Sequence, residues 1–266
     1  MIDRIVLGSA SLGSVVPQPQ SLALLKQAFA AGISRVDTAP FYGAGFAPRL
    51  IARAITESGA PVRVSTKFGS FREPGWRMLA KRLRRARSAA DLLPVPGPGY
   101  GNADRENPQW WRAPIQQALI GQATAPFDKA ALEYLFIHFA PCAVGDDSLR
   151  TLQPLAAAQG ARLGICSPPD EHLPGALTAP PALSECLQIH LSQFLRFRDR
   201  IDVAALPALW LHGLYSPLPD DPLPDLASRE AACVDLAQQF PQVRYVVGIK
   251  SERSLDKLLR LGTRLA

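Results

Sequence analysis

The sequence has few cysteines and no long apolar run, and each absence argues against a class of protein. Its four cysteines are scattered, without the close spacing of a zinc site or a redox pair: Cys142, Cys166, Cys186 and Cys233. We therefore expect reduced, buried thiols in a cytosolic protein. No apolar stretch approaches the length of a membrane-spanning helix, and the N-terminus passes from Asp3 and Arg4 straight into a strand. These features predict a cytoplasmic location, without membrane insertion or secretion.

Two widespread functional motifs are also missing. The four histidines show no HExxH or similar ligand spacing, so no metal ligands are predicted: His138, His172, His190 and His212. The GxGxxG fingerprint of an open dinucleotide-binding fold is absent, and the short Gly-rich pieces at Gly43 and Gly97 are typical of turns. Metal catalysis therefore has little support.

The size and charge of the chain suit a barrel that binds an anion. A chain of 266 residues with 47% hydrophobic residues is long enough for a large core and lies in the range of one α/β barrel. Its net charge of +6 favours an anionic ligand, such as a phosphate-bearing cofactor. The same excess charge also occurs for solubility alone, so it specifies no partner.

Short apolar runs alternate with segments of helical spacing along most of the chain. Strands are expected at residues 4–12, 33–37, 62–68, 132–138, 162–167, 187–194, 208–215 and 243–249. Helices are expected at residues 21–31, 47–57, 111–122, 149–159, 229–239 and 251–261. This alternation predicts a (β/α)8 TIM barrel, a single domain over residues 1–266, rather than an open sheet.

The alternation breaks at residues 70–108, after the third expected strand. The first half of this insertion has the spacing of a basic helix, and the second half is a loop rich in Pro and Gly. Because it follows a strand, we expect it to overhang the catalytic face as a lid or a substrate-selecting loop. Its basic residues are more typical of a solvated helix face than of a nucleic-acid site. Aromatic residues in and beside it would suit an apolar or ring-bearing substrate: Trp76, Tyr100, Trp110 and Trp111.

Polar residues stand at the ends of three neighbouring strands. Asp37 and Tyr42 follow the second, Lys67 ends the third, and His138 ends the fourth. In a parallel barrel these strand ends form the catalytic face. Lys67 requires a nearby carboxylate, because burying an unpaired ammonium is unfavourable. Taken singly, Asp37 is also explained as a turn cap, Tyr42 as a packing aromatic, and His138 as a structural histidine.

These residues carry a resemblance to the aldo-keto reductase superfamily. DTAPFYG resembles the family signature DTAxxYG, and Lys67 and His138 stand in the places of its catalytic lysine and histidine. RLGICS, YSPL and GIKS are similar to three later motifs, so the resemblance covers almost the whole chain apart from the insertion. It implies hydride transfer with Tyr42 as general acid, Lys67 lowering the pKa of the phenol, Asp37 pairing with Lys67, and His138 orienting the carbonyl.

The resemblance also implies an NADP(H) site. Gln188 would hold the nicotinamide carboxamide, and Tyr215 would stack on the nicotinamide ring. The complete predicted set of cofactor-binding residues is Gly8, Ser9, Ser167, Gln188, Tyr215, Ser216, Leu218, Gly248, Lys250, Ser251 and Arg253. The chain departs from the family pattern where Pro168 replaces asparagine, where Ser254 replaces arginine, and where Lys257 and Leu258 replace a Glu-Asn pair. Weakened cofactor binding is therefore expected, with Arg253 or the basic insertion as compensation.

The leading hypothesis is an NADPH-dependent reductase of a small carbonyl compound, or the same enzyme oxidising an alcohol. We expect a monomer or a small homo-oligomer, with no membrane or nucleic-acid partner. The altered cofactor motifs keep a second hypothesis open, a non-catalytic barrel that regulates or assembles with a partner, with or without bound NADP(H). A third is unrelated chemistry on the same fold.

Overall fold

A computed structural model of the chain describes residues 2–69, 113–138, 146–167, 170, 173, 185–223 and 225–265. Eight parallel strands pair in chain order and close into a barrel, because the last strand also pairs with the first. The predicted (β/α)8 TIM barrel is therefore confirmed. The predicted insertion at residues 70–108, with its aromatic residues, lies outside the described residues.

The strands alternate between the barrel interior and the surrounding helices. They are β1 Ile5–Gly8, β2 Arg35–Asp37, β3 Arg63–Phe68, β4 Leu132–His138, β5 Arg162–Cys166, β6 Cys186–His190, β7 Leu209–His212 and β8 Val243–Gly248. One buried cluster fills the barrel, made of Val6, Tyr134, Phe136, Cys166, Cys186, Ala208, Trp210 and Val246. The positions between them along the strands belong to a larger cluster under the helices. This alternation decides which residues at the strand ends face the mouth of the barrel.

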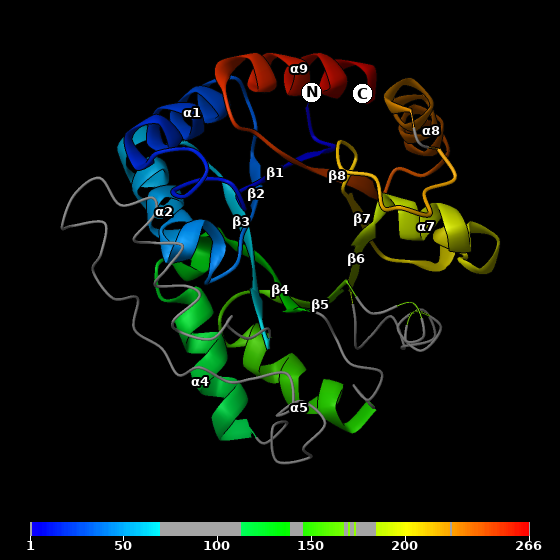
Figure 1. Ribbon diagram of the computed structural model, residues 1–266. Coiled ribbons are helices and arrows are strands. Elements are labelled where there is room, and N and C mark those ends of the chain that lie inside the picture. Colours follow the sequence, from blue (N-terminus) through cyan, green and yellow to red (C-terminus); the bar gives the residue numbers. More distant parts are fainter. Residues whose placement is uncertain are drawn as a thin grey trace.

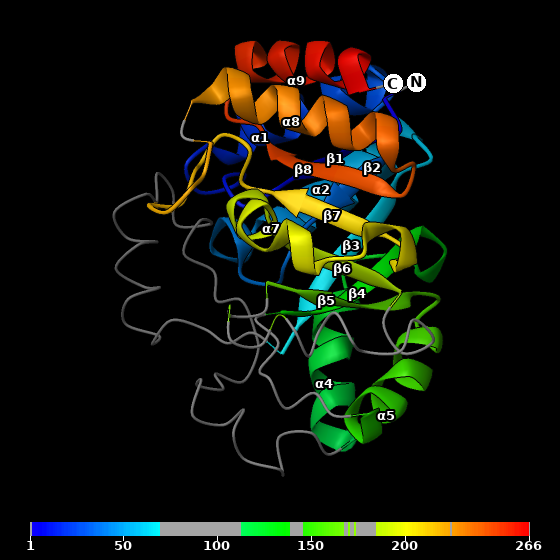
Figure 2. The same ribbon diagram turned by 90° about the vertical axis from the view of Figure 1, so that its right-hand side faces the viewer.

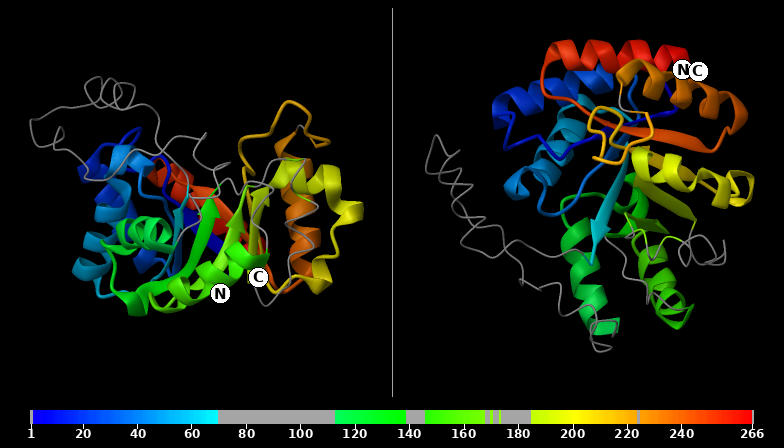
Figure 3. Two further views of the ribbon diagram at one scale, coloured as in Figure 1. Left: turned by 90° about the horizontal axis from the view of Figure 1, so that it is seen from below. Right: turned by 45° about the vertical axis from the view of Figure 1, so that its right-hand side comes forward.

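The helices form an outer ring around these strands, as Figures 1 and 3 show. They are α1 Gln18–Ala30, α2 Ala47–Ser58, α4 Ala113–Thr124, α5 Asp146–Ala157, α7 Leu191–Phe197, α8 Leu226–Gln239 and α9 Glu252–Leu265. Helices α8 and α9 lie side by side, and α8 packs against β8 (Figure 2). None of the helices in the described ranges is long and apolar enough to cross a membrane.

Three of the strand predictions are too long at the C-terminal side of the barrel, and the first of these strands ends at Gly8 rather than at residue 12. Residues 191–194 begin α7 instead of continuing β6, because the Nδ1 atom of His190 accepts the amide hydrogen of Ser192 and caps the new helix. The seventh strand ends at His212 rather than at residue 215, because Gly213 has φ of 83° and turns the chain. The corrections to β6 and β7 lie beside the candidate site.

Candidate active site

An ion pair lies at the mouth of the barrel, between the ends of β2 and β3. The Asp37 and Lys67 residues are 3% and 1% exposed, and the Lys67 ammonium bonds to both carboxylate oxygens of Asp37. The ammonium also donates to the carbonyl oxygen of Thr38 at 3.2 Å. The expectation that Lys67 needs a carboxylate is confirmed. Burial is the largest single influence and acts to lower the pKa of Lys67. The charge of Asp37 and its hydrogen bond, together with Tyr42 and Cys166, outweigh burial and raise the pKa above its usual value. Lys67 is therefore a fixed cation.

Tyr42 stands in a 3-10 turn, Tyr42–Gly45, that directly follows the Asp-Thr-Ala-Pro segment. The turn needs glycine at position 43, where φ is 60° and a Cβ atom would overlap the carbonyl oxygen of Leu12. The Lys67 ammonium lies 5.2 Å from the centre of the Tyr42 ring. The turn thus places the phenol beside the buried cation.

The pKa of Tyr42 differs from the sequence expectation. Burial raises it to about 12, although Lys67 acts in the opposite direction, and Asp37 partly cancels the effect of Lys67. We expected the ammonium to lower the phenol pKa, and its influence has that sign, but desolvation is the larger effect. Tyr42 is therefore a protonated phenol at neutral pH, suited to donate a proton.

His138 ends β4 on the same side of the mouth. It is 4% exposed, and its ring stacks on Phe41 with centroids 5.5 Å apart and planes 6° apart. Tyr42 meets the His138 ring edge-on at 6.4 Å between centroids. Phe41 also contacts Tyr42, at 5.3 Å. The four predicted catalytic residues are thus brought together, and Phe41 holds two of them in place without having been singled out in the sequence.

Polar side chains from β5, β6 and β7 form the opposite wall of the mouth. Gln188 is 1% exposed and hydrogen-bonds to Asp37. Burial raises the pKa of the Asp37 carboxyl, and Lys67 and the hydrogen bond from Gln188 act in the opposite direction. The other polar atom of this amide, Oε1, has no hydrogen-bond partner among the described residues. The Ser167 hydroxyl lies 3.1 Å from Nε2 of His212, and Ser167 has a positive φ of 49°. Burial, then His190 and Lys67, lower the pKa of His212 to about 3.

A separate cavity of about 390 Å³ opens between the loop after β7 and the helices α8 and α9. One wall is apolar and the other carries two lysines, and the complete lining is Leu214, Tyr215, Pro217, Leu226, Arg229, Gly248, Lys250, Ser254 and Lys257. None of these lining residues is acidic. An apolar wall facing two ammonium groups fits a flat ring that carries a phosphate.

Three of the predicted cofactor residues line this cavity, and the others lie around it or at the mouth. Tyr215, Gly248 and Lys250 belong to the lining. Gly8 pairs with Gly248 in the sheet, and the Ser9 hydroxyl donates to the carbonyl oxygen of Asp37. The remaining residues lie elsewhere: Ser167 and Gln188 at the mouth, Ser216 and Leu218 in the loop after β7, and Ser251 and Arg253 at the start of α9. No lining contact is assigned to Arg253, which is exposed.

The side chain of Ser254 hydrogen-bonds to backbone amides at the start of α9. Its hydroxyl oxygen accepts the amide hydrogens of Lys250 at 2.8 Å and Ser251 at 2.9 Å. The Ser251 hydroxyl accepts the amide hydrogen of Ser254 at 3.2 Å in return. This reciprocal cap uses backbone donors that would otherwise attract an anion to the helix terminus. Anion binding in the cavity therefore depends on the ammonium groups of Lys250 and Lys257.

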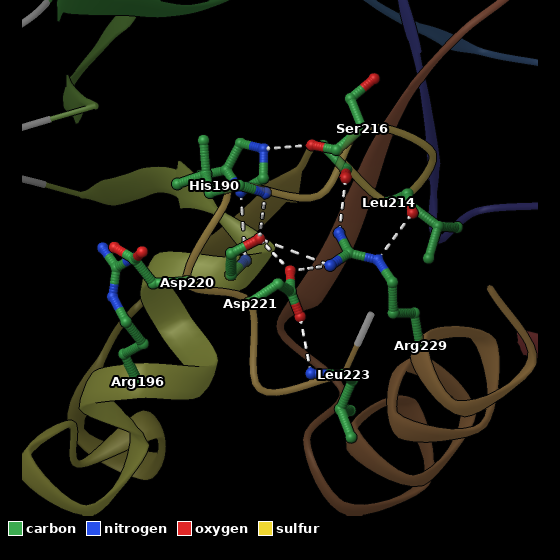
Figure 4. A network of polar contacts seen from close by, with 11 residues as sticks. His190, Arg196, Leu214, Ser216, Asp220, Asp221, Leu223 and Arg229 are labelled. Carbon is green, nitrogen blue, oxygen red and sulfur yellow. Dashed lines mark hydrogen bonds and ion pairs between the residues drawn. The ribbon is translucent and has the colours of Figure 1, made fainter. Parts of the chain in front are cut away.

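A buried network around Arg229 holds the loop between β7 and α8 (Figure 4). The Arg229 guanidinium donates to the carbonyl oxygens of Leu214 at 2.9 Å and Gly213 at 2.6 Å, and it forms an ion pair with Asp221. Arg229 is 1% exposed. Asp221 also accepts from the hydroxyl of Ser192. The network fixes the loop that supplies one wall of the cavity.

His190 joins this loop to the mouth. Its Nε2 atom donates to the carbonyl oxygen of Ser216 at 3.0 Å, and its ring meets the His212 ring edge-on at 5.1 Å between centroids. A Cβ atom on Gly213 would overlap the His190 ring, so the loop and this ring fit together only with glycine. His190, His212 and Arg229 are not among the site residues predicted from the sequence. A signal for Arg229 was available, because it shares the buried face of α8 with Cys233, Leu236 and Ala237.

Comparison of the sequence with known proteins indicates one family. Residues 4–93 match the model of the aldo/keto reductase family. L-galactose dehydrogenase of Arabidopsis thaliana is 29% identical over 91 residues, which are 32% of this chain and 28% of that enzyme. The aligned part is therefore less than a third of either protein.

Comparison of the fold gives similar proteins along nearly the whole chain. An aldo-keto reductase from Bacillus halodurans has a TM-score of 0.68 at 13% identity, covering 97% of this chain and 86% of that one. Glycerol dehydrogenase from Gluconobacter oxydans has a TM-score of 0.60 at 15% identity, covering 98% and 90%. An aldo/keto reductase from Klebsiella pneumoniae, solved with NADP and acetate, has a TM-score of 0.54 at 15% identity, covering 98% and 85%. At these identities the likeness is one of fold.

Proposed function

We propose that the chain is a member of the aldo-keto reductase superfamily, whose model matches residues 4–93, and that it is an NADPH-dependent oxidoreductase that reduces an aldehyde or ketone to an alcohol, or catalyses the reverse oxidation. The observation that carries the proposal is the buried pair of Asp37 and Lys67 beside Tyr42 and His138 at the mouth of the barrel. The match to the family model supports oxidoreductase chemistry in general. The specific cofactor and the role of each residue are our inference.

In this proposal Tyr42 is the proton donor. Reduction of a carbonyl places negative charge on its oxygen, and a phenol with a pKa of about 12 is protonated and available at neutral pH. Lys67 stabilises the phenolate that remains after proton transfer, and Asp37 keeps Lys67 charged and in place. His138 donates a hydrogen bond that orients the carbonyl oxygen. When bound, the nicotinamide supplies or accepts the hydride.

The described residues fit a nucleotide of the NADP type. The unpartnered Oε1 atom of Gln188 is an acceptor for the amide group of nicotinamide. Lys250 and Lys257 are two cations in a cavity without an acidic lining residue, which favours the additional phosphate of NADP over the hydroxyl of NAD. The NADP complex of the similar fold from Klebsiella pneumoniae supports this choice. Lys257 takes the role that we expected of Arg253.

We place the enzyme in the cytosol, as a monomer or small homo-oligomer that acts on a small carbonyl or alcohol. Three cysteines, Cys166, Cys186 and Cys233, are buried and unpaired, which suits a reducing compartment. A single barrel with the insertion at residues 70–108 as its substrate-selecting segment remains our proposal for the domain organisation.

Two experiments test the proposal, first nucleotide binding and then turnover. NADPH and NADH are titrated by calorimetry into the wild-type protein and into Lys250→Ala and Lys257→Ala, with Lys26→Ala as the control. Lys26 is an exposed lysine of α1 outside the cavity. We expect a preference for NADPH that both cavity variants reduce about tenfold and the control leaves unchanged.

Turnover is then measured with a panel of aldehydes and ketones, following NADPH absorbance. We expect Tyr42→Phe to lower kcat about a thousandfold with little change in NADPH affinity, since general acids contribute factors of this order. Activity of Tyr42→Phe close to wild type would contradict the proposed mechanism.

The capping of α9 by Ser254 favours one alternative, a barrel that does not catalyse hydride transfer, because it withdraws two backbone donors from the cofactor cavity. A folded protein that binds neither nucleotide would overturn the reductase proposal and support this alternative.

A further inference from the structure

The wall of the mouth formed by β5, β6 and β7 contains a polar pair that the proposed mechanism does not use. Ser167 follows the last residue of β5, and His212 is the last residue of β7. The two side chains lie 3.1 Å apart, Oγ to Nε2, across the intervening strand β6. Because His212 follows the inward-facing Trp210 by two residues, its ring faces the mouth. The effect of the Lys67 charge on His212 agrees with this position.

The hydrogen-bonding groups of this wall suit a primary amide. Gln188 lies on β6, between the two strands, and its buried Oε1 atom is an acceptor with no partner among the described residues. A primary amide has N–H donors and one carbonyl acceptor, so it needs one acceptor and one donor from the protein. Gln188 supplies the acceptor. If Nε2 of His212 carries its proton, His212 donates to the Ser167 oxygen and leaves the Ser167 hydroxyl hydrogen for the ligand.

We propose that His212 is a positioning residue for the cofactor, which directs the Ser167 hydroxyl toward the carbonyl oxygen of the nicotinamide amide while Gln188 receives its N–H. This inference rests on the proposed use of NADP(H) and adds a residue that its family resemblance did not indicate. His212 thereby compensates for Pro168, which has no side-chain donor at the position where the family pattern has asparagine. The low pKa of His212 keeps its ring neutral at physiological pH, so it adds no charge beside the nicotinamide ring.

His190 supports the same arrangement from outside. Its Nδ1 atom accepts from the backbone of Ser192 and its Nε2 atom donates to Ser216, so its orientation is fixed by two hydrogen bonds. Its ring packs edge-on against His212. The His212 ring is therefore held between Ser167 on one side and His190 on the other.

The experiment compares ligands with and without the nicotinamide. Calorimetry measures dissociation constants of NADP⁺ and of adenosine 2′,5′-bisphosphate, which has the adenosine and the phosphate but no nicotinamide. The variants are His212→Phe, which keeps a ring and removes the hydrogen bond, and His212→Asn, which keeps a donor. We expect His212→Phe to weaken NADP⁺ binding about five- to tenfold, the loss of one hydrogen bond. His212→Asn should recover part of that loss.

The bisphosphate is the control for folding and for the cavity. Its affinity should stay within about twofold of wild type in both variants, because no described lining residue of the cavity is changed. Equal weakening of both ligands by His212→Phe would show a general structural effect and overturn the inference.

Ser167→Gly provides a second, independent measurement. Glycine tolerates the positive φ at this position and removes only the hydroxyl. We expect the NADP⁺ affinity of Ser167→Gly to fall as in His212→Phe, and the double variant to be no weaker than either single one, since both changes remove the same interaction. Fully additive losses would overturn the inference.

The outcomes separate this inference from the proposed function. Unchanged NADP⁺ affinity in His212→Phe, in a protein that binds NADP⁺ more tightly than the bisphosphate, overturns the role of His212 and leaves the reductase proposal intact. A wild-type protein that binds neither ligand overturns the proposed cofactor, and the role of His212 with it.

Discussion

The two walls of the barrel mouth are built in different ways. On the wall of β2, β3 and β4, the side chains of Asp37, Lys67 and His138 are delivered by the last or next-to-last residue of a strand. On the wall of β6 and β7, the loop after β7 takes its shape from Arg229, which lies in the following helix. The positions in the first wall follow mainly from strand geometry, with the ion pair of Asp37 and Lys67 and the packing of Phe41 holding the side chains. The second depends on a polar network whose members are far apart in the sequence.

This difference predicts distinct consequences when each buried ion pair is broken. The largest effect is expected for Lys67→Met, which leaves the Asp37 carboxylate buried without its cation. Removing one partner of a buried pair typically lowers stability by about 3 to 5 kcal/mol. Chemical denaturation measures the loss, and turnover should fall below detection because the phenolate of Tyr42 loses its stabilising charge. Asp37→Asn combined with Lys67→Met should regain much of the stability but none of the activity. Activity in that double variant would contradict the role of Lys67.

Arg229→Met tests the second wall. We expect a loss of stability of about 3 kcal/mol, at the low end for a buried pair, because Ser192 and the amide of Leu223 still hydrogen-bond to Asp221. The affinity for NADPH should fall together with the stability, because the loop after β7 forms one wall of the cavity. The value of kcat at saturating NADPH should change less than about threefold. Denaturation and steady-state kinetics together measure both effects. A large fall in kcat with unchanged NADPH affinity would show that the two walls are not separable in this way.

The pH dependence of the reaction rates tests the assignment of Tyr42, beside the first wall, as the proton donor. With a pKa raised to about 12, the phenol is protonated throughout the range of pH 6 to 9, so the reduction rate should vary little through this group. Oxidation requires the phenolate, whose fraction rises about tenfold for each pH unit below the pKa. Initial rates in both directions between pH 6 and 9 provide the measurement. An oxidation rate that levels off near pH 7 would contradict the high pKa.

The smallest effect is expected for an ion pair that belongs to neither wall. Lys26 and Glu57 form an exposed pair, with side chains 43% and 33% exposed. Lys26→Ala should change the free energy of unfolding by less than about 1 kcal/mol, because solvent screens such pairs. Denaturation under the conditions used for Lys67→Met gives the comparison. A loss as large as that of Lys67→Met would mean that burial does not distinguish the pairs.

The same contrast explains what the sequence could predict. The barrel and the residues of the first wall follow from local patterns in the sequence. An apolar run ends in the polar residue that it places at the mouth, as His138 follows Leu-Phe-Ile. The expected strand at residues 187–194 was too long because apolar residues continue past His190, and only the cap on Ser192 shows that a helix begins there. The pairing of Ser167 with His212 joins residues 45 positions apart, and no short motif encodes it.

The predicted cofactor residues are only partly brought together in the fold, for a related reason. Lys250 lines the cavity, and the second lysine there is Lys257, one of the departures from the family pattern. A pattern compares positions one at a time, whereas the cavity depends on the helical spacing that brings Lys257 to the same side as Ser254. The contribution of Lys257 was therefore visible only once α9 was placed against the loop after β7.

The close fit of Gly213 against the His190 ring has a consequence for engineering. Loops of such barrels are natural targets for exchange between related enzymes, because they carry specificity while the strands carry stability. Here the glycine of one loop and the histidine that ends the neighbouring strand occupy complementary space. A transplanted loop that brings any larger residue to this position would push the ring away from both Ser216 and His212. Gly213 and His190 therefore depend on each other, and an exchange of this loop should replace both residues at once.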